Sequence, residues 1–254
     1  MKMKPLYMVA AVLGCLVLLA ISQYLFITFN GTNVPAPNIP RQPLTKGSGD
    51  NLNYLVLGDS SAISQGSDYS QGVAVGTTDH LAQKYKVTMT NLAVSGARTK
   101  DVLQSQLPQF EGSPDIVLLL IGSNDVTHFT SKASIEKSLR AIISEIKYKN
   151  CKVKIVVTGS AQMGAVPRLP QPARWLVGAR TTSVNKLFKQ VSDQEKLTFA
   201  ALAEKTGDTF RGNLKLFAPD KFHANGEGYA VWTPVFNDSI DEALTNQPAH
   251  CAQD

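Results

Sequence analysis

The sequence predicts an α/β protein built on a three-layer, doubly wound (flavodoxin-like) parallel sheet. Two observations lead to this prediction. From Leu52 onward, short runs rich in Val, Ile and Leu alternate with segments of helical period, and this pattern is typical of a parallel sheet with helices on both faces. Polar clusters directly follow several of the apolar runs, as expected of a fold that binds ligands at the carboxyl ends of its strands.

Composition limits the number of domains and the kinds of partner. The chain has 254 residues, of which 43% are hydrophobic and 18% charged, enough to bury the core of one ordinary domain. The net charge of +5 comes from 25 basic and 20 acidic residues without a long block of one sign, so no nucleic-acid partner is expected. Three cysteines without a CxxC pair or a His/Cys cluster offer no zinc site. We therefore expect neither a metal nor a cofactor.

Residues 1–29 are predicted to form a transmembrane anchor or a signal segment. The chain carries no charge from Pro5 to Phe29, which is about 37 Å of helix and enough to cross a bilayer core. Lys2 and Lys4 precede this run and no charge follows before Arg41, which favours an N-terminus inside and the remainder outside the cytoplasm. The protein is therefore expected in the cell envelope, held to the membrane by this segment.

Two other interpretations of the N-terminus remain open. Ala20 and Ser22 are spaced like a signal-peptidase site, and cleavage there would give a secreted protein; residues 12–15 (VLGC) loosely resemble a lipoprotein processing box. The apolar run continues past both positions, through Leu25 and Phe26, whereas a cleaved signal usually gives way to polar sequence. A retained anchor is therefore the favoured interpretation.

The remaining chain divides into a linker, a folded domain and a tail. Residues 30–52 are rich in Pro, Gly, Asn and Thr without any apolar period, which predicts a flexible linker. The domain is expected over 53–245, and 246–254 form a C-terminal tail. Cys151 and Cys251 are candidates for a disulfide in an oxidising compartment. Because sequence does not show proximity, two unpaired thiols are the favoured interpretation.

The elements of the domain follow from apolar runs and helical periods. The clearest helix has isoleucines and a leucine at three- and four-residue steps. Strands are expected at Tyr54–Leu57, Val87–Leu92, Ile116–Ile121, Val153–Thr158 and Leu197–Leu202. Helices are expected at Gly76–Tyr85, Lys100–Leu107, Ser134–Lys149, Val177–Val191 and Gly226–Leu244.

Four parts of an acyl-transfer site can be named from the polar clusters. Ser60 follows the first strand and a Gly-Asp turn, which suits a nucleophile at the edge of the sheet. His223 is the best candidate base, and Asp220, three residues earlier, can orient its ring. The expected oxyanion donors are the backbone N–H groups of Ser60 and Gly96 and the side-chain amide of Asn124.

These clusters resemble the sequence blocks of the SGNH/GDSL hydrolase superfamily. The matching segments, in order, are Gly58-Asp59-Ser60, Gly96 in NLAVSGA, Asn124 in IGSND, and Asp220 and His223 in FAPDKFHANGEGY. The resemblance covers roughly residues 52–244 and implies the SGNH hydrolase fold, with a Ser-Asp-His triad that uses no metal. It also implies an esterase or lipase, with thioesterase, lysophospholipase and carbohydrate acetylesterase as related activities. Ser61 replaces the usual Leu, and Ala224-Asn225 the frequent Pro-Ser, but neither change removes a catalytic atom.

The predicted function is the hydrolysis of a small-molecule, lipid or glycan ester through an acyl-Ser60 intermediate. His128, Arg168 and Arg174 are possible substrate-rim residues, although each also fits an ordinary surface loop. Transfer of the acyl group to an alcohol by the same triad is the nearest alternative. A metal phosphoesterase would need several closely spaced metal ligands, which this sequence lacks. A catalytically silent envelope-binding module would have no need of a complete triad. Acyl and alcohol specificity and the oligomeric state are not predicted.

Overall fold

A six-stranded sheet forms the centre of the protein. The structure is a computed structural model, and it describes residues 5–40, 42–246, 248–249 and 251. The strands lie in the order β1-β3-β2-β4-β5-β6, with β2 to β6 parallel and β1 antiparallel to β3. Their bounds are β1 Leu44–Lys46, β2 Asp50–Gly58, β3 Tyr85–Asn91, β4 Ile116–Leu120, β5 Lys154–Thr158 and β6 Thr198–Phe199. Without β1 this is the flavodoxin-like order, so the predicted fold class is confirmed.

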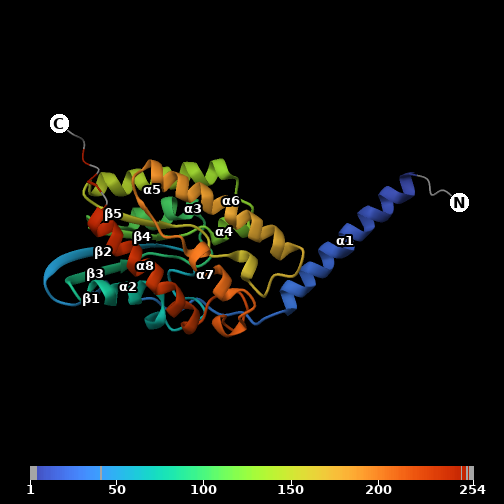
Figure 1. Ribbon diagram of the computed structural model, residues 1–254, viewed down its shortest axis with the longest axis horizontal. Helices are drawn as coiled ribbons and strands as arrows, with labels where there is room; N and C mark the ends of the chain where they lie inside the picture. Colours follow the sequence, from blue (N-terminus) through green and yellow to red (C-terminus); the bar gives the residue numbers. More distant parts are fainter. Residues whose placement is uncertain (1–4, 41, 247, 250, 252–254) are drawn as a thin grey trace.

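Helices cover both faces of the sheet (Figure 1). One face is covered by α2 and α8, with α7 packed on α8, and the other by α3, α5 and α6. The bounds are α1 Pro5–Phe29, α2 Val73–Leu81, α3 Thr99–Asp101, α4 Ser123–Thr127, α5 Lys132–Lys149, α6 Ala173–Gln194, α7 Leu202–Phe210 and α8 Gly226–Asn246. A π-helical turn, Val102–Gln106, and a short 3-10 turn, Leu107–Gln109, continue α3.

The core lies between the sheet and these helices. Every residue of β4 is buried, as expected of a central strand covered on both faces. The periodic apolar residues of α5 are buried against the sheet, as the sequence predicted. Ser131 begins this helix, because its side chain accepts a hydrogen bond from the backbone N–H of Ser134.

Three elements differ from the sequence-based prediction. Residues 44–46, expected in a flexible linker, form the edge strand β1, which pairs with β3. The predicted strand Leu197–Leu202 contains only the two-residue β6, because the chain turns at Ala200 and Leu202 begins the unpredicted helix α7. The helix predicted over Gly76–Tyr85 ends at Leu81, because Tyr85 already pairs with β2.

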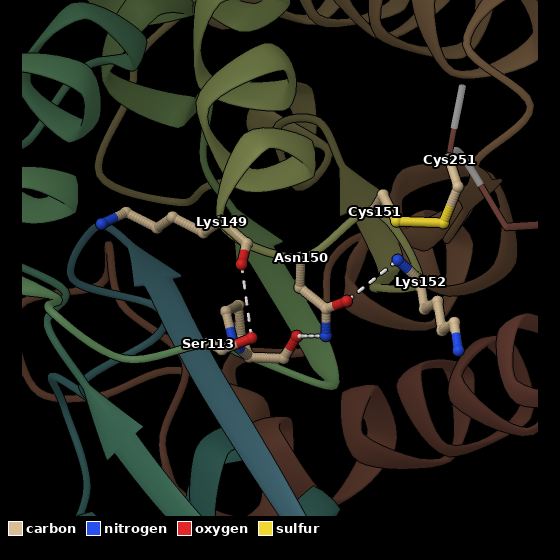
Figure 2. Close-up of a disulfide and its surroundings, with 7 residues drawn as sticks. Ser113, Lys149, Asn150, Cys151, Lys152 and Cys251 are labelled. Carbon is tan, nitrogen blue, oxygen red and sulfur yellow. Dashed lines mark hydrogen bonds between the residues drawn. A yellow bond between two sulfur atoms is a disulfide. The ribbon is translucent and has the colours of Figure 1, made fainter. Parts of the chain in front are cut away.

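The C-terminal tail is joined to the domain by a disulfide between Cys151 and Cys251. Their Cα atoms are 4.7 Å apart, and Figure 2 shows Cys151 in the connection between α5 and β5. The favoured prediction of two unpaired thiols is therefore wrong. Sequence gave no measure of proximity across 100 positions, and the fold supplies it. The same connection is braced by Asn150, whose side chain donates to the Pro114 carbonyl over 2.8 Å.

Helix α1 projects away from the domain (Figure 1). Its residues Tyr7–Phe29 have a mean hydropathy of 2.3, and the helix is long and apolar enough to cross a membrane. Lys2, Lys4 and Arg41, on which the predicted orientation depends, lie outside the described residues. The chain beyond the helix is not free: the Thr32 N–H donates to the Pro219 carbonyl over 3.4 Å.

Candidate active site

The segment before α8 brings Asp220 and His223 together. Asp220 Oδ2 lies 2.6 Å from His223 Nδ1, and its Oδ1 accepts the backbone N–H groups of Phe222 (2.9 Å) and His223 (3.0 Å). Lys221 has φ +56°, which closes this tight turn. Burial alone would raise the pKa of Asp220, but the hydrogen bonds from His223 and the two backbone groups lower it below its usual value. The carboxylate is therefore charged and oriented toward the imidazole.

Ser60 stands on a tight turn after β2. Asp59 is 1% exposed, and its Oδ1 accepts the N–H of Ser61 over 2.9 Å, which fixes the turn as an Asx motif does. Burial raises the pKa of Asp59 to about 6, although the bonds from Ser61 act in the opposite direction. Gly58 has φ +155°, and a Cβ there would lie 2.1 Å from the Leu120 carbonyl oxygen. Only glycine fits this approach to β4.

A small cavity joins the residues predicted to react. Its lining includes Ser60, Asn124 and His223, so segments that end β2, follow β4 and precede α8 meet at one place. The centres of water-sized molecules can occupy about 40 Å³ of this cavity. Most of the remaining wall is apolar. It comes from the segment after β5, from α7, from the segment between α7 and α8, and from α8, and it includes Ala161, Met163, Ala165, Val166, Phe210, Phe217, Phe222 and Trp232.

Of the predicted oxyanion donors, Ser60 and Asn124 line the cavity, while Gly96 is exposed. Asn124 lies in the first turn of α4, and its Nδ2 donates to the Ala97 carbonyl over 3.0 Å. This bond ties the Gly96 loop to α4. Gly96 has φ +80°, a conformation that favours glycine. Gly96 itself does not line the cavity.

The three predicted rim residues lie outside the cavity lining. His128 is exposed, and its Nδ1 lies 2.9 Å from the Asn124 carbonyl. Arg174 Nε donates to the Leu169 carbonyl over 2.8 Å. Arg168 donates to the carbonyl of Ile27 and, over 3.4 Å, to that of Asp220. Arg168 thus contacts the backbone of the Asp-His turn rather than the cavity, and a role of any of the three toward substrate stays a prediction.

Two glutamines that sequence reasoning missed support the site. Gln106 is fully buried, accepts the N–H of Gly58 (2.9 Å) and donates to its carbonyl (2.7 Å), so it fixes both backbone groups just before the Asp-Ser turn. Gln65 accepts from Ser95 (2.5 Å) through its side chain, and its backbone carbonyl accepts from Tyr229 (2.8 Å). Neither glutamine stands in a recognisable motif, so no signal in the sequence identified them.

The described part of the chain contains no group of three His, Cys, Asp or Glu side chains placed to hold a metal ion. The polar side chains that line the cavity instead carry hydroxyls, amides and one imidazole; they are Ser60, Ser61, Ser123, Thr206, Asn124, Gln162 and His223. The cavity lies at the carboxyl ends of the strands, where flavodoxin-like sheets bind their ligands.

Residues 56–231 match the GDSL-like lipase/acylhydrolase family, and the chain belongs to this family. Known structures share its fold. A structure described as TesA is 22% identical, with a TM-score of 0.58 over 77% of this chain and 99% of that one. The psychrotrophic esterase EstA from Pseudoalteromonas sp. is 20% identical, with a TM-score of 0.58 over 76% and 99%.

A third similar structure is phospholipase A1 from Streptomyces albidoflavus NA297, which is 19% identical, with a TM-score of 0.55 over 74% of this chain and 99% of that one. No curated protein matches the sequence. At these identities the structural likeness establishes the fold, and the family match establishes the general class of esterases, lipases and acylhydrolases.

Proposed function

We propose that the protein hydrolyses carboxylic esters through an acyl intermediate on Ser60. The observation that carries this proposal is the shared cavity of Ser60 and His223, with the His223 ring held 2.6 Å from the Asp220 carboxylate. Membership of the GDSL-like lipase/acylhydrolase family supports it.

In the first half-reaction, His223 Nε2 takes the hydroxyl proton of Ser60 as Oγ attacks the ester carbonyl. The C–O bond to the alcohol then breaks, and the imidazolium returns the proton to the leaving oxygen. In the second half-reaction, water attacks the acyl-Ser60 ester, His223 takes the water's proton and returns it to Ser60 Oγ, and the carboxylic acid leaves. Asp220 holds the Nδ1 proton throughout and stabilises the imidazolium.

The oxyanion formed in each half-reaction needs hydrogen-bond donors. The proposed donors are the backbone N–H groups of Ser60 and Gly96 and the Asn124 amide. A primary amide has two N–H bonds. In Asn124 the bond to Ala97 uses one of them, so the second is available to the oxyanion. Ala97 thereby sets the direction of the Asn124 amide.

The walls of the cavity favour an uncharged, short acyl group. Aromatic and aliphatic side chains make up most of the lining, and the centres of water-sized molecules can occupy only about 40 Å³ of the cavity. Burial of a charged acyl group among such side chains would carry a large desolvation cost. We therefore expect esters of acetate and butyrate to be hydrolysed faster than the corresponding dodecanoate when all are dissolved in water.

The test uses the full chain in detergent with p-nitrophenyl acetate and butyrate. Ser60→Ala and His223→Ala are each expected to remove nearly all hydrolysis and to leave the thermal midpoint little changed. Ser113→Ala and His80→Ala are matched controls. Ser113 is exposed near the disulfide, and His80 pairs with Asp241 over 3.0 Å outside the cavity. Full activity of Ser60→Ala would overturn the proposal.

We propose that α1 remains attached as a membrane anchor and that the domain lies outside the cytoplasm. Two independent observations support this topology. Lys2 and Lys4 precede the apolar helix and favour an inside N-terminus. The Cys151–Cys251 disulfide belongs in an oxidising compartment. Cleavage after Ser22 would instead release a secreted enzyme.

A further inference from the structure

We propose that the domain rests on the outer surface of the bilayer through the start of α6, and that the cavity receives its ester from the membrane. This inference rests on the proposed esterase function and on the anchoring of α1. It identifies the substrate as an ester resident in the bilayer, which goes beyond the ester hydrolysis proposed above.

The end of α1 lies directly against the turn that holds the Asp-His pair. Arg168 Nε donates to the carbonyl of Ile27, in the last turn of α1, over 3.1 Å, and its guanidinium also donates to the Asp220 carbonyl over 3.4 Å. One side chain thus connects the helix with the catalytic turn. Lys221, the residue after Asp220, donates to the side-chain oxygen of Asn30 over 2.7 Å.

The backbone just after the helix is packed equally closely. At Gly31, which has φ +132°, a Cβ would lie 2.5 Å from the Asp220 carbonyl oxygen. The side chain of Asn30 donates to the Pro167 carbonyl over 3.3 Å, and the preceding residue, Val166, lines the cavity. One wall of the cavity is therefore continuous with the contact between the domain and α1.

An exposed apolar surface lies beside the same helix. Trp175 is 69% exposed and Leu176 is 48% exposed in the first turn of α6. With Leu16, Leu19, Ala20, Gln23, Pro172 and Ala173, they line an apolar groove between α1 and α6. In Figure 1 the domain end of α1 and the start of α6 lie at the same end of the molecule. A contiguous exposed apolar surface of this kind marks a site of interaction, because contact of its side chains with water is unfavourable.

The position of the groove along α1 identifies its occupant as lipid. About 20 apolar residues cross a hydrocarbon core, so Pro5–Tyr24 is sufficient, and Leu19–Gln23 lie near the outer boundary of that core. Trp175 and Leu176, packed beside this boundary, would enter the bilayer at the depth that tryptophan favours. Surface-bound amphipathic helices lie at such a depth, about 5–10 Å into the acyl boundary.

Charged side chains on this side suit lipid head groups. Arg174 directly precedes Trp175, and Arg168 and Lys221 contact the end of α1. Cationic groups at a membrane surface are attracted to head-group phosphates. Arg174, predicted at the substrate rim, is therefore better placed to contact the membrane, whereas the Arg168 guanidinium is held by the carbonyls of Ile27 and Asp220.

The first test compares two esters that differ only in membrane partitioning, with the full chain reconstituted in phosphatidylcholine vesicles. The esters are a coumarin butyrate and the same butyrate with a hexadecyl chain on the coumarin. The double variant Trp175→Ser, Leu176→Ser is expected to hydrolyse the hexadecyl ester at least fivefold more slowly and the soluble ester unchanged. Tyr148→Ser, at an 89% exposed tyrosine near the disulfide, is the matched control and should change neither rate.

The second test measures the depth of Trp175 without any enzyme activity. The sequence has two tryptophans, and the other, Trp232, is only 6% exposed. Brominated lipids are expected to quench the fluorescence of the unaltered protein, and Trp175→Phe should abolish this quenching. Equal loss of both esters in the double variant, or no quenching of Trp175, would overturn the membrane contact. Hydrolysis of neither ester by the unaltered protein would refute the esterase function, and the quenching result would still decide the contact.

Discussion

At the scale of single residues, the proposed mechanism has Asp220 act on catalysis only through His223. In Asp220→Asn the side-chain oxygen can still accept the two backbone N–H groups, but the new N–H faces His223 Nδ1. The ring proton then moves to Nε2, which no longer accepts the Ser60 proton. We expect kcat for p-nitrophenyl butyrate to fall by about 10⁴ with little change in KM. A loss below tenfold would contradict the assigned role.

Asp59 and Asp220 have opposite effects on how the free energy of unfolding changes with pH. Burial raises the pKa of Asp59 from 3.8 to about 6, so between these values the folded state binds more protons than the unfolded state. The free energy of unfolding therefore falls as the pH rises from about 4 to 6. The lowered pKa of Asp220 gives a contribution that is present above its ordinary pKa and lost as the pH falls through the lowered value.

Asp59→Asn should remove the first of these two effects. The amide oxygen keeps the bond from Ser61 without a buried charge at neutral pH. The difference in the free energy of unfolding between the variant and the unaltered protein is expected to grow in favour of the variant as the pH rises from 4 to 8, by up to about 3 kcal/mol. Denaturant unfolding in detergent at both pH values measures this. Asp208→Asn, at a side chain that is 97% exposed, is the control, and an equal gain there would refute the assignment to Asp59.

The residues proposed to carry chemistry were identified from sequence because they stand in short motifs. Ser60 and Asn124 follow apolar strands, and Asp220 and His223 precede the last helix. Their supports could not. Gln106 reaches Gly58 across 48 positions and carries no local signal. Arg168 was predicted at the substrate rim because it lies in a loop after β5, but contacts with Ile27 and the Asp220 backbone occupy its guanidinium. Such contacts depend on how distant segments pack.

At the scale of elements, the disulfide stabilises the junction between the tail and β5. A crosslink that closes a 100-residue separation restricts the unfolded chain strongly, and loss of such a bond typically costs about 2–4 kcal/mol. Cys251→Ser is therefore expected to lower the thermal midpoint and leave kcat unchanged, because neither cysteine lines the cavity. A reductant should lower the midpoint of the unaltered protein to that of the variant. A further drop of the variant in reductant would contradict this account.

Long elements with a strong apolar pattern were predictable, and short ones were not. The central strands and α5 bury continuous or periodic apolar residues, which determine their type. β1 has three residues and pairs through backbone groups with β3, so its sequence needs no alternation of its own. Helix α7 was missed because Leu197–Leu202 and its first turn share one apolar stretch, which sequence alone assigned to a strand.

At the scale of the whole molecule, the proposed membrane topology predicts a definite cellular behaviour. If α1 stays attached, mass spectrometry of the membrane fraction should detect the intact N-terminal peptide. A membrane-impermeant biotin reagent should label exposed lysines of the domain, such as Lys189, in intact cells. A mature chain that begins at Gln23 would contradict retention, and labelling only after lysis would contradict the orientation. The apolar span was predictable from composition, whereas its attachment to the catalytic turn is a tertiary contact.

The sheet itself ends in very short strands on both sides. β1 contributes three residues and β6 only two, so each margin presents few unpaired backbone groups. Long open margins recruit strands from other chains and promote aggregation. Molecules confined to a surface collide with one another far more often than molecules free in solution. Because β1 and β6 are so short, strands of neighbouring copies find few backbone groups to pair with. Crowded copies of the protein on a membrane are therefore expected to stay unaggregated.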